Sequence, residues 1–130
     1  MAYEEMVTFS RGTGVAYADL STSQFYAVKL TANGMELATA AKAIDGILQD
    51  NPLAGKAGCY ASDGVTKAAV SASQAFSVGQ LLEVDSGSTL KATYAGVIVA
   101  KALEAVTSVA TISIIAVEIM RNAPNGTVFA

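Results

Sequence analysis

Side chains that could carry catalysis are scarce in this sequence. The chain has 130 residues, with no His, one Cys and eleven Asp and Glu residues. Without His, a Ser or Cys nucleophile lacks its usual general base, and no Gly-x-Ser-x-Gly motif is present. Cys59 has no partner for an intrachain disulfide, so we expect a buried and inert thiol. We therefore predict no catalytic residues and no enzyme.

Metal and cofactor sites are equally unsupported. The acidic residues are scattered, and Asp45, Asp50 and Asp63 lie too far apart for a calcium loop. Gly12-Thr13-Gly14 and Gly55-Lys56 lack the remaining residues of a phosphate-binding loop, so we interpret both as turns. We predict no metal and no cofactor.

The charge balance limits the partners. The net charge is −3 and only 15% of residues are charged, which argues against nucleic acid because phosphate binding needs clustered Lys and Arg. The most apolar stretch, 95–120, is interrupted by charged residues and is no membrane span. The acidic N-terminus does not resemble a secretory signal, so we expect synthesis in a cytoplasm. A weakly charged surface of small residues suits a protein packed among neighbours.

Short alternating segments and turn residues indicate strands from Gln24 onward. Phe25 to Leu30 alternates with a period of two and is followed by Asn33-Gly34, which favours a turn. Further turns are predicted at 50–52, 62–64 and 86–88, and further strands at 78–85 and 96–105. In the segment 111–120 the apolar phase shifts at Ile115, which predicts a core strand, with Ile114 inside and a bulge near Ile115.

An internal repeat organises these strands. Residues 28–37 resemble 82–90, and 46–50 align with 101–105, at an offset of 53 to 55 positions. The segment 35–49 taken alone would favour a helix, but the repeat makes 37–49 mostly extended, with room for one short helix. We predict a mainly β fold, a small sandwich or barrel built from two related halves, about 28–58 and 82–113, within one domain at 21–130.

Residues 1–20 differ from the rest. Large side chains flank a flexible Gly-Thr-Gly segment, and the stretch is too short to bury them by itself. We predict that this stretch is an N-terminal arm that docks on a neighbouring subunit or a larger partner; the alternative is a frayed terminus. The residues expected at that interface are Tyr3, Met6, Phe9, Arg11 and Tyr17.

Two stretches carry a family pattern. Residues 44–58 read IDGILQDNPLAGKAG, and residues 75–90 read AFSVGQLLEVDSGSTL. They resemble the capsid cement, or head decoration, proteins of tailed bacteriophages over about residues 24–120. Pro52-Leu53 and the segment 107–110 depart from that pattern.

The resemblance implies a structural virion protein on the outer surface of an icosahedral head. Such proteins bridge capsid subunits, so the implied partners are the major capsid protein and further copies of this chain, commonly as a trimer. The family has no catalytic residues to transfer. The alternative is a small β module that binds a ligand such as a host glycan, which the absence of Trp disfavours.

Overall fold

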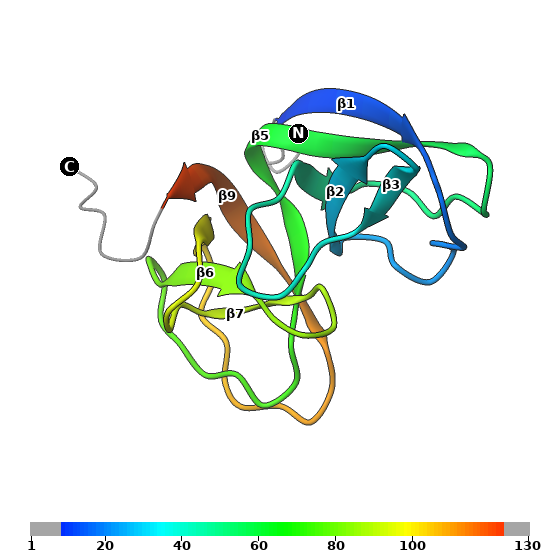
Figure 1. Cartoon of the computed structure of the whole chain (residues 1–130). Coiled ribbons are helices and arrows are strands. Elements are labelled where there is room, and N and C mark those ends of the chain that lie inside the picture. Colours follow the sequence, from blue (N-terminus) through cyan, green and yellow to red (C-terminus); the bar gives the residue numbers. More distant parts are fainter. Residues whose placement is uncertain (1–8, 124–130) are drawn as a thin grey trace, which may run out of the picture.

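The computed structural model of the chain describes residues 9–123 (Figure 1). Within these residues the regular structure is all β, and no helix forms, so the mainly β prediction is confirmed and the short helix does not occur. The strands are β1 (Phe9–Val15), β2 (Ala27–Thr31), β3 (Gly34–Leu37), β4 (Gly46–Leu48), β5 (Ala57–Val70), β6 (Leu81–Val84), β7 (Leu90–Ala92), β8 (Ile98–Ala102) and β9 (Ser113–Ala123).

The second half of the chain closes into a five-stranded barrel. The end of β5 pairs in parallel with β7 through Val70 and Leu90, and β5 also pairs antiparallel with β9 over 64–70. β6 lies between β7 and β8, and β8 pairs with β9, so the ring of hydrogen-bonded neighbours is complete. We call this unit, residues 64–123, the second barrel.

The first half makes the same kind of ring. β1 pairs with the first part of β5, β5 with β4, β4 with β2, and β2 with β3. A parallel bridge between Ala16 and Met35 connects β3 back to the chain that follows β1, and the Tyr17 N–H donates to the Met35 carbonyl at 3.0 Å. We call this unit, residues 9–63, the first barrel.

The two barrels repeat each other in register as well as in strand order. The Ala16–Met35 bridge corresponds to the Val70–Leu90 pair, and Val28–Gly46 corresponds to Leu82–Ala100. Residues 16, 28 and 46 thus correspond to 70, 82 and 100, a shift of 54 positions, and Met35 corresponds to Leu90, a shift of 55. The similarity runs from β1 to β9, beyond the segments recognised in the sequence.

The long strand β5 passes from one barrel to the other (Figure 1). Ser10 is opposite Asp63 and Arg11 is opposite Ala61, so Ser62 is an extra residue and the strand bulges there. Gly64 follows with φ of 91°, a left-handed conformation that suits glycine. The turn predicted at 62–64 is therefore wrong. The same residue types bend a continuous strand because a bulge needs the turn's conformational freedom.

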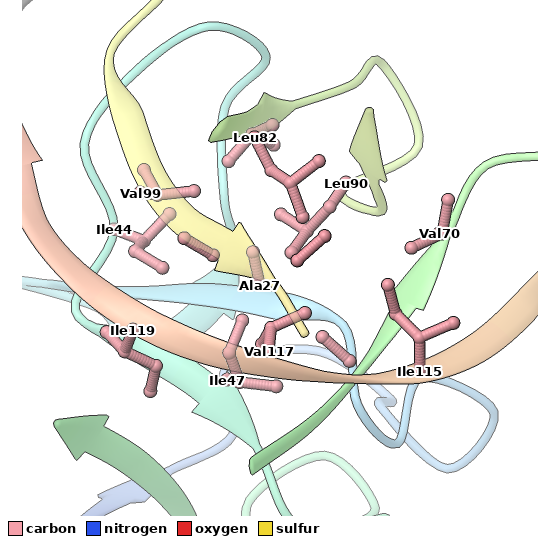
Figure 2. Packing of buried hydrophobic residues seen from close by; sticks show 14 of the residues in the cluster. Ala27, Ile44, Ile47, Val70, Leu82, Leu90, Val99, Ile115, Val117 and Ile119 are labelled. Carbon is pink, nitrogen blue, oxygen red and sulfur yellow. The ribbon is translucent and has the colours of Figure 1, made fainter. Parts of the chain in front are cut away.

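Two groups of buried side chains hold the molecule together. The smaller fills the first barrel and contains Leu20, Val28, Met35 and Leu48 among others. The larger fills the second barrel and extends across the junction (Figure 2). Ala27, Ile44 and Ile47 of the first barrel belong to it with residues of the second, including Val117 and Ile119. The two barrels therefore share apolar contacts, and each loses buried surface without the other.

The N-terminal arm is not separate where the structure describes it. β1 pairs with β5 of the same chain over its whole length, from Phe9 to Val15. The prediction that residues 1–20 dock elsewhere instead of joining their own domain is therefore wrong for these strand residues, because β1 satisfies its backbone within the sheet. Residues 1–8 lie outside the described part.

The last strand also differs from its prediction. β9 pairs with β5 from Ser113 to Ile119 without interruption, so no bulge lies near Ile115. Ile115, Val117 and Ile119 face the core, whereas Ile114 is 47% exposed. The apparent shift of phase arises because Ile112 and Ile114 are apolar residues on the outer face.

The expected hairpins are present. Asn33 lies in the two-residue turn between β2 and β3, where Gly34 has φ of 134°. The 86–88 turn joins β6 to β7. The segment 37–49 contains the end of β3 and all of β4, but residues 38–45 form a loop in which Ala41 has φ of 63°, so the segment is extended only near its ends.

A pair of substitutions tests the facing of β9. Val117→Asp places an unpaired charge in the core and should cost about 3–5 kcal/mol or prevent folding. Ile114→Asp should cost less than about 1 kcal/mol because its side chain already reaches water. Urea denaturation of both variants measures the difference. Equal losses would show that Ile114 is also a core residue.

A second test concerns the contact between β4 and β5. A Cβ atom added at Gly46 would overlap the carbonyl oxygen of Ala61, which belongs to the backbone and has little freedom to move. Gly46→Ala should therefore reduce the free energy of unfolding by about 1–3 kcal/mol. The matched control is Gly87→Ala, where the nearest atom to the new Cβ lies 3.9 Å away. Similar stabilities of the two variants would contradict the close approach.

Candidate functional site

The described residues contain no assembled metal site. Among residues 9–123, no group of three or more His, Cys, Asp and Glu side chains is arranged to hold an ion. In the same part of the chain, no helix could cross a bilayer. Cys59 is free and half-buried on β5, more accessible than predicted, and the Asp50 carboxylate accepts a hydrogen bond from its N–H.

One Ser–Lys spacing was overlooked in the sequence. Ser88-Thr89-Leu90-Lys91 has the Ser-x-x-Lys pattern of some acyl-transfer enzymes. In the fold, the Ser88 hydroxyl donates to the Ala38 carbonyl at 2.8 Å, and Lys91 Nζ lies 3.7 Å from a carboxylate oxygen of Glu83. These contacts join the barrels and support the β6–β7 hairpin, and they give the serine no base.

A hollow of about 390 Å³ opens at the junction of the barrels. Three of its polar side chains already make hydrogen bonds with backbone groups. Asp45 accepts from the Leu30 N–H at 2.7 Å, and Asp63 accepts from the Gly64 N–H at 2.8 Å. The Asn122 amide makes two hydrogen bonds of 2.9 Å with the backbone of Ile44. The hollow is lined by Ile44, Asp45, Ser62, Asp63, Ile119, Met120 and Asn122. We interpret it as part of the junction.

A cluster of hydroxyl and carboxyl groups closes the second barrel. The Ser71 hydroxyl lies 2.6 Å from both Asp85 Oδ2 and Thr89 Oγ1. The hydrogen bond from Ser71 lowers the pKa of Asp85 below its usual 3.8, and the Ser86 N–H and Lys91 act in the same direction. The cluster ties the end of β5 to the β6–β7 hairpin.

The predicted interface residues separate into two groups. Tyr3 and Met6 lie outside the described residues, as does the side chain of Phe9. Arg11 and Tyr17 are both exposed, at β1 and just after it, with Val15 between them on the same outward face. Their role at an interface stays a prediction.

Sequence reasoning missed other exposed apolar side chains. Val15 and Leu30 lie on the first barrel, and Val78 and Tyr94 lie on loops of the second. Tyr94 is 82% exposed, yet its loop is held because Glu83 Oε1 accepts from the N–H groups of Tyr94 and Gly96 at 2.7 and 2.8 Å. The one available signal was large apolar residues in segments rich in small ones.

Two strand rings that share one strand define a tandem β-barrel protein. The same fold occurs in the crystal structure of the head fiber gp8.5 N base of bacteriophage phi29. The two superpose with a TM-score of 0.61 at 14% sequence identity, over 89% of this chain and 98% of the other. At this identity the similarity establishes a shared fold. No family model matches the sequence, and no curated protein is significantly similar to it.

The Ser71–Asp85 contact predicts an acid dependence of stability. Because the pKa of Asp85 is lower in the folded chain than in the unfolded chain, its ionised form stabilises the fold above about pH 3.8. This contribution is lost as the pH falls through the folded-state pKa. Ser71→Ala should destabilise the protein more at about pH 6 than at about pH 2, as measured by urea denaturation.

The difference in stability between Ser71→Ala and the unmodified chain, taken at each pH, reports the contribution of Asp85. Asp19 also has a lowered pKa, through hydrogen bonds from Ser21, but it is the same in both proteins. Ser77→Ala, at an exposed position, is the control and should lower stability equally at both pH values. An equal loss at both pH values for Ser71→Ala would contradict the assignment.

Proposed function

We propose that this chain is a structural protein of a tailed-phage virion, located on the outer surface of the head, where it bridges capsid subunits. The observation that carries the proposal is the fold shared with a phage head fiber base over nearly all of both chains. The resemblance of 44–58 and 75–90 to head decoration proteins is an independent line of support for a structural role in the virion.

The proposed partners are the major capsid protein and further copies of this chain, with a homotrimer as the expected assembly. Exposed apolar side chains and the low charge suit burial against protein, and a stable contact needs at least about 1,000 Å². The alternative of a glycan-binding module gains no support from the junction hollow, because its lining residues include no aromatic side chain.

Heads that lack the protein provide the direct test. We expect the purified chain to sediment with such heads and to saturate at a fixed number of copies per head, because the capsid lattice repeats one site. The bound fraction is measured by quantitative gel analysis of the pellet. A chain that stays in the supernatant at tens of micromolar, the range of weak contacts of about 6 kcal/mol, would contradict the proposal.

A short N-terminal deletion tests whether the first residues contribute to head binding. Removing 2–14 would take away most of β1 and damage the first barrel, so the informative variant lacks only 2–7. If these residues contact the head, the variant should fold normally and bind heads at least tenfold more weakly. Unchanged binding would place the contacts on the barrels instead.

A further inference from the structure

Backbone hydrogen bonds join the two barrels, in addition to the apolar contacts across the junction. The Ala69 N–H donates to the Phe25 carbonyl at 2.9 Å, which joins β5 to the segment before β2. The Ala41 N–H donates to the Val84 carbonyl at 2.9 Å, and the Ala41 carbonyl accepts from the Val97 N–H at 3.1 Å. The first barrel thus uses its 25–27 segment and its 38–41 loop to dock on β5 and β6 of the second.

Because the barrels repeat, each contains a counterpart of both docking surfaces. On the first barrel, Val15 and Leu30 correspond to Ala69 and Val84 by the shift of 54 positions. On the second, Gly79 corresponds to Phe25, and the 93–96 loop replaces the 38–41 loop. We name Val15, Leu30 and Gly34 face A, and Val78, Gly79, Leu81 and Tyr94 face B.

Face A has the same backbone groups as the docking surface of the second barrel, but no barrel of this chain covers them. The Val15 N–H points away from β5, since the neighbouring Ala16 N–H is the one that donates to the Lys56 carbonyl at 2.9 Å. Among residues 9–123, neither the Val15 N–H nor the Leu30 carbonyl has the backbone partner that its counterpart has in the second barrel.

Equivalent positions of the two barrels differ in exposure according to whether another barrel is docked on them. Ala69 and Val84 are each 0% exposed, whereas Val15 is 53% exposed and Leu30 is 42% exposed. The difference follows from the first barrel, which covers Ala69 and Val84 but has no barrel on its own face A. On face B, Val78 is 63% exposed and Tyr94 is 82% exposed, and the loop of Tyr94 is fixed by Glu83.

We infer that face B of one copy docks on face A of a second copy of this chain, repeating between chains the contact that the two barrels make within one. The contact is head to tail, so it continues as a ring or a chain of copies according to the rotation between successive barrels. The inference rests on the self-association part of the proposed function and names its surfaces.

The contact between copies is more polar than the one within the chain. Ile47 and Ala61, which pair across β4 and β5, are fully buried at the internal junction. The matching pair next to face B is Lys101 and Glu118 across β8 and β9, where the shift on the last strand has grown to 57 positions. Charged residues at these positions reduce the apolar area that docking would bury. Copies should therefore associate reversibly, with a dependence on concentration, while the two barrels of one chain stay joined.

Light scattering on the purified full-length chain, without heads, tests the inference. The chain mass is 13.2 kDa, and we expect a larger mass that increases with concentration from about 1 to 100 μM. Val15→Asp on face A and Tyr94→Asp on face B should each return the protein to the monomer mass. Ile114→Asp, the same change at an exposed apolar position outside both faces, should associate as the unmodified chain does.

Mixing the two variants separates a head-to-tail contact from a symmetric one. Val15→Asp keeps face B and Tyr94→Asp keeps face A, so their mixture should form a dimer of twice the chain mass. Circular dichroism confirms that each variant is folded. A monomeric unmodified chain at all concentrations, or equal dissociation by Ile114→Asp, would overturn the inference. Since heads are absent, these outcomes leave the head-binding test unaffected.

Discussion

The bend in β5 is the constraint on which the rest of the structure depends. One strand provides the last wall of the first barrel and the first wall of the second, with the extra residue Ser62 and the left-handed Gly64 between them. β1 and β9 pair with successive parts of this strand. The relative position of the barrels is therefore set by covalent continuity and by the bulge as well as by the apolar contacts of Ala27, Ile44 and Ile47 across the junction.

Polar side chains near the shared strand hold the surrounding segments in place. The buried and half-buried polar groups mostly hold loops against the barrels: Asn122 fixes the chain at Ile44, and Gln49 donates to Thr66 at 2.9 Å across the junction. These groups satisfy backbone or side-chain partners that would otherwise be buried without hydrogen bonds. These polar groups therefore support the fold, whereas faces A and B carry exposed apolar side chains.

Much of the local structure could be predicted from the sequence, because hairpins depend on nearby residues. Asn33-Gly34 and the 86–88 segment specify turns through their own backbone preferences, and the repeat identified the matching hairpins. The bend at 62–64 could not be distinguished from a turn, since both require the same residue types. The facing of Ile114 failed for another reason: an apolar residue on an outer face looks like a core residue when only its hydropathy is known.

The candidate surfaces were harder to predict than the fold. Arg11 and Tyr17 were predicted to lie at an interface on a separate arm, whereas β1 belongs to the sheet and both side chains are exposed on it or just after it. Val15 and Tyr94 were missed because their exposure depends on which barrel covers which. Which barrel covers which surface follows from the packing of the two repeats in space, and it cannot be deduced from a single segment of the sequence.

The pairing of β1 and β9 with one strand has a consequence for the order in which the chain folds. All strands of the first barrel are synthesised by residue 63, whereas the second barrel cannot close until β9, its last strand, is available. Pairings between distant segments form slowly because the intervening loop must first be ordered. The first barrel can thus form early and offer β5 as a template, with Ala27 and Ile47 exposed to water until the second barrel covers them.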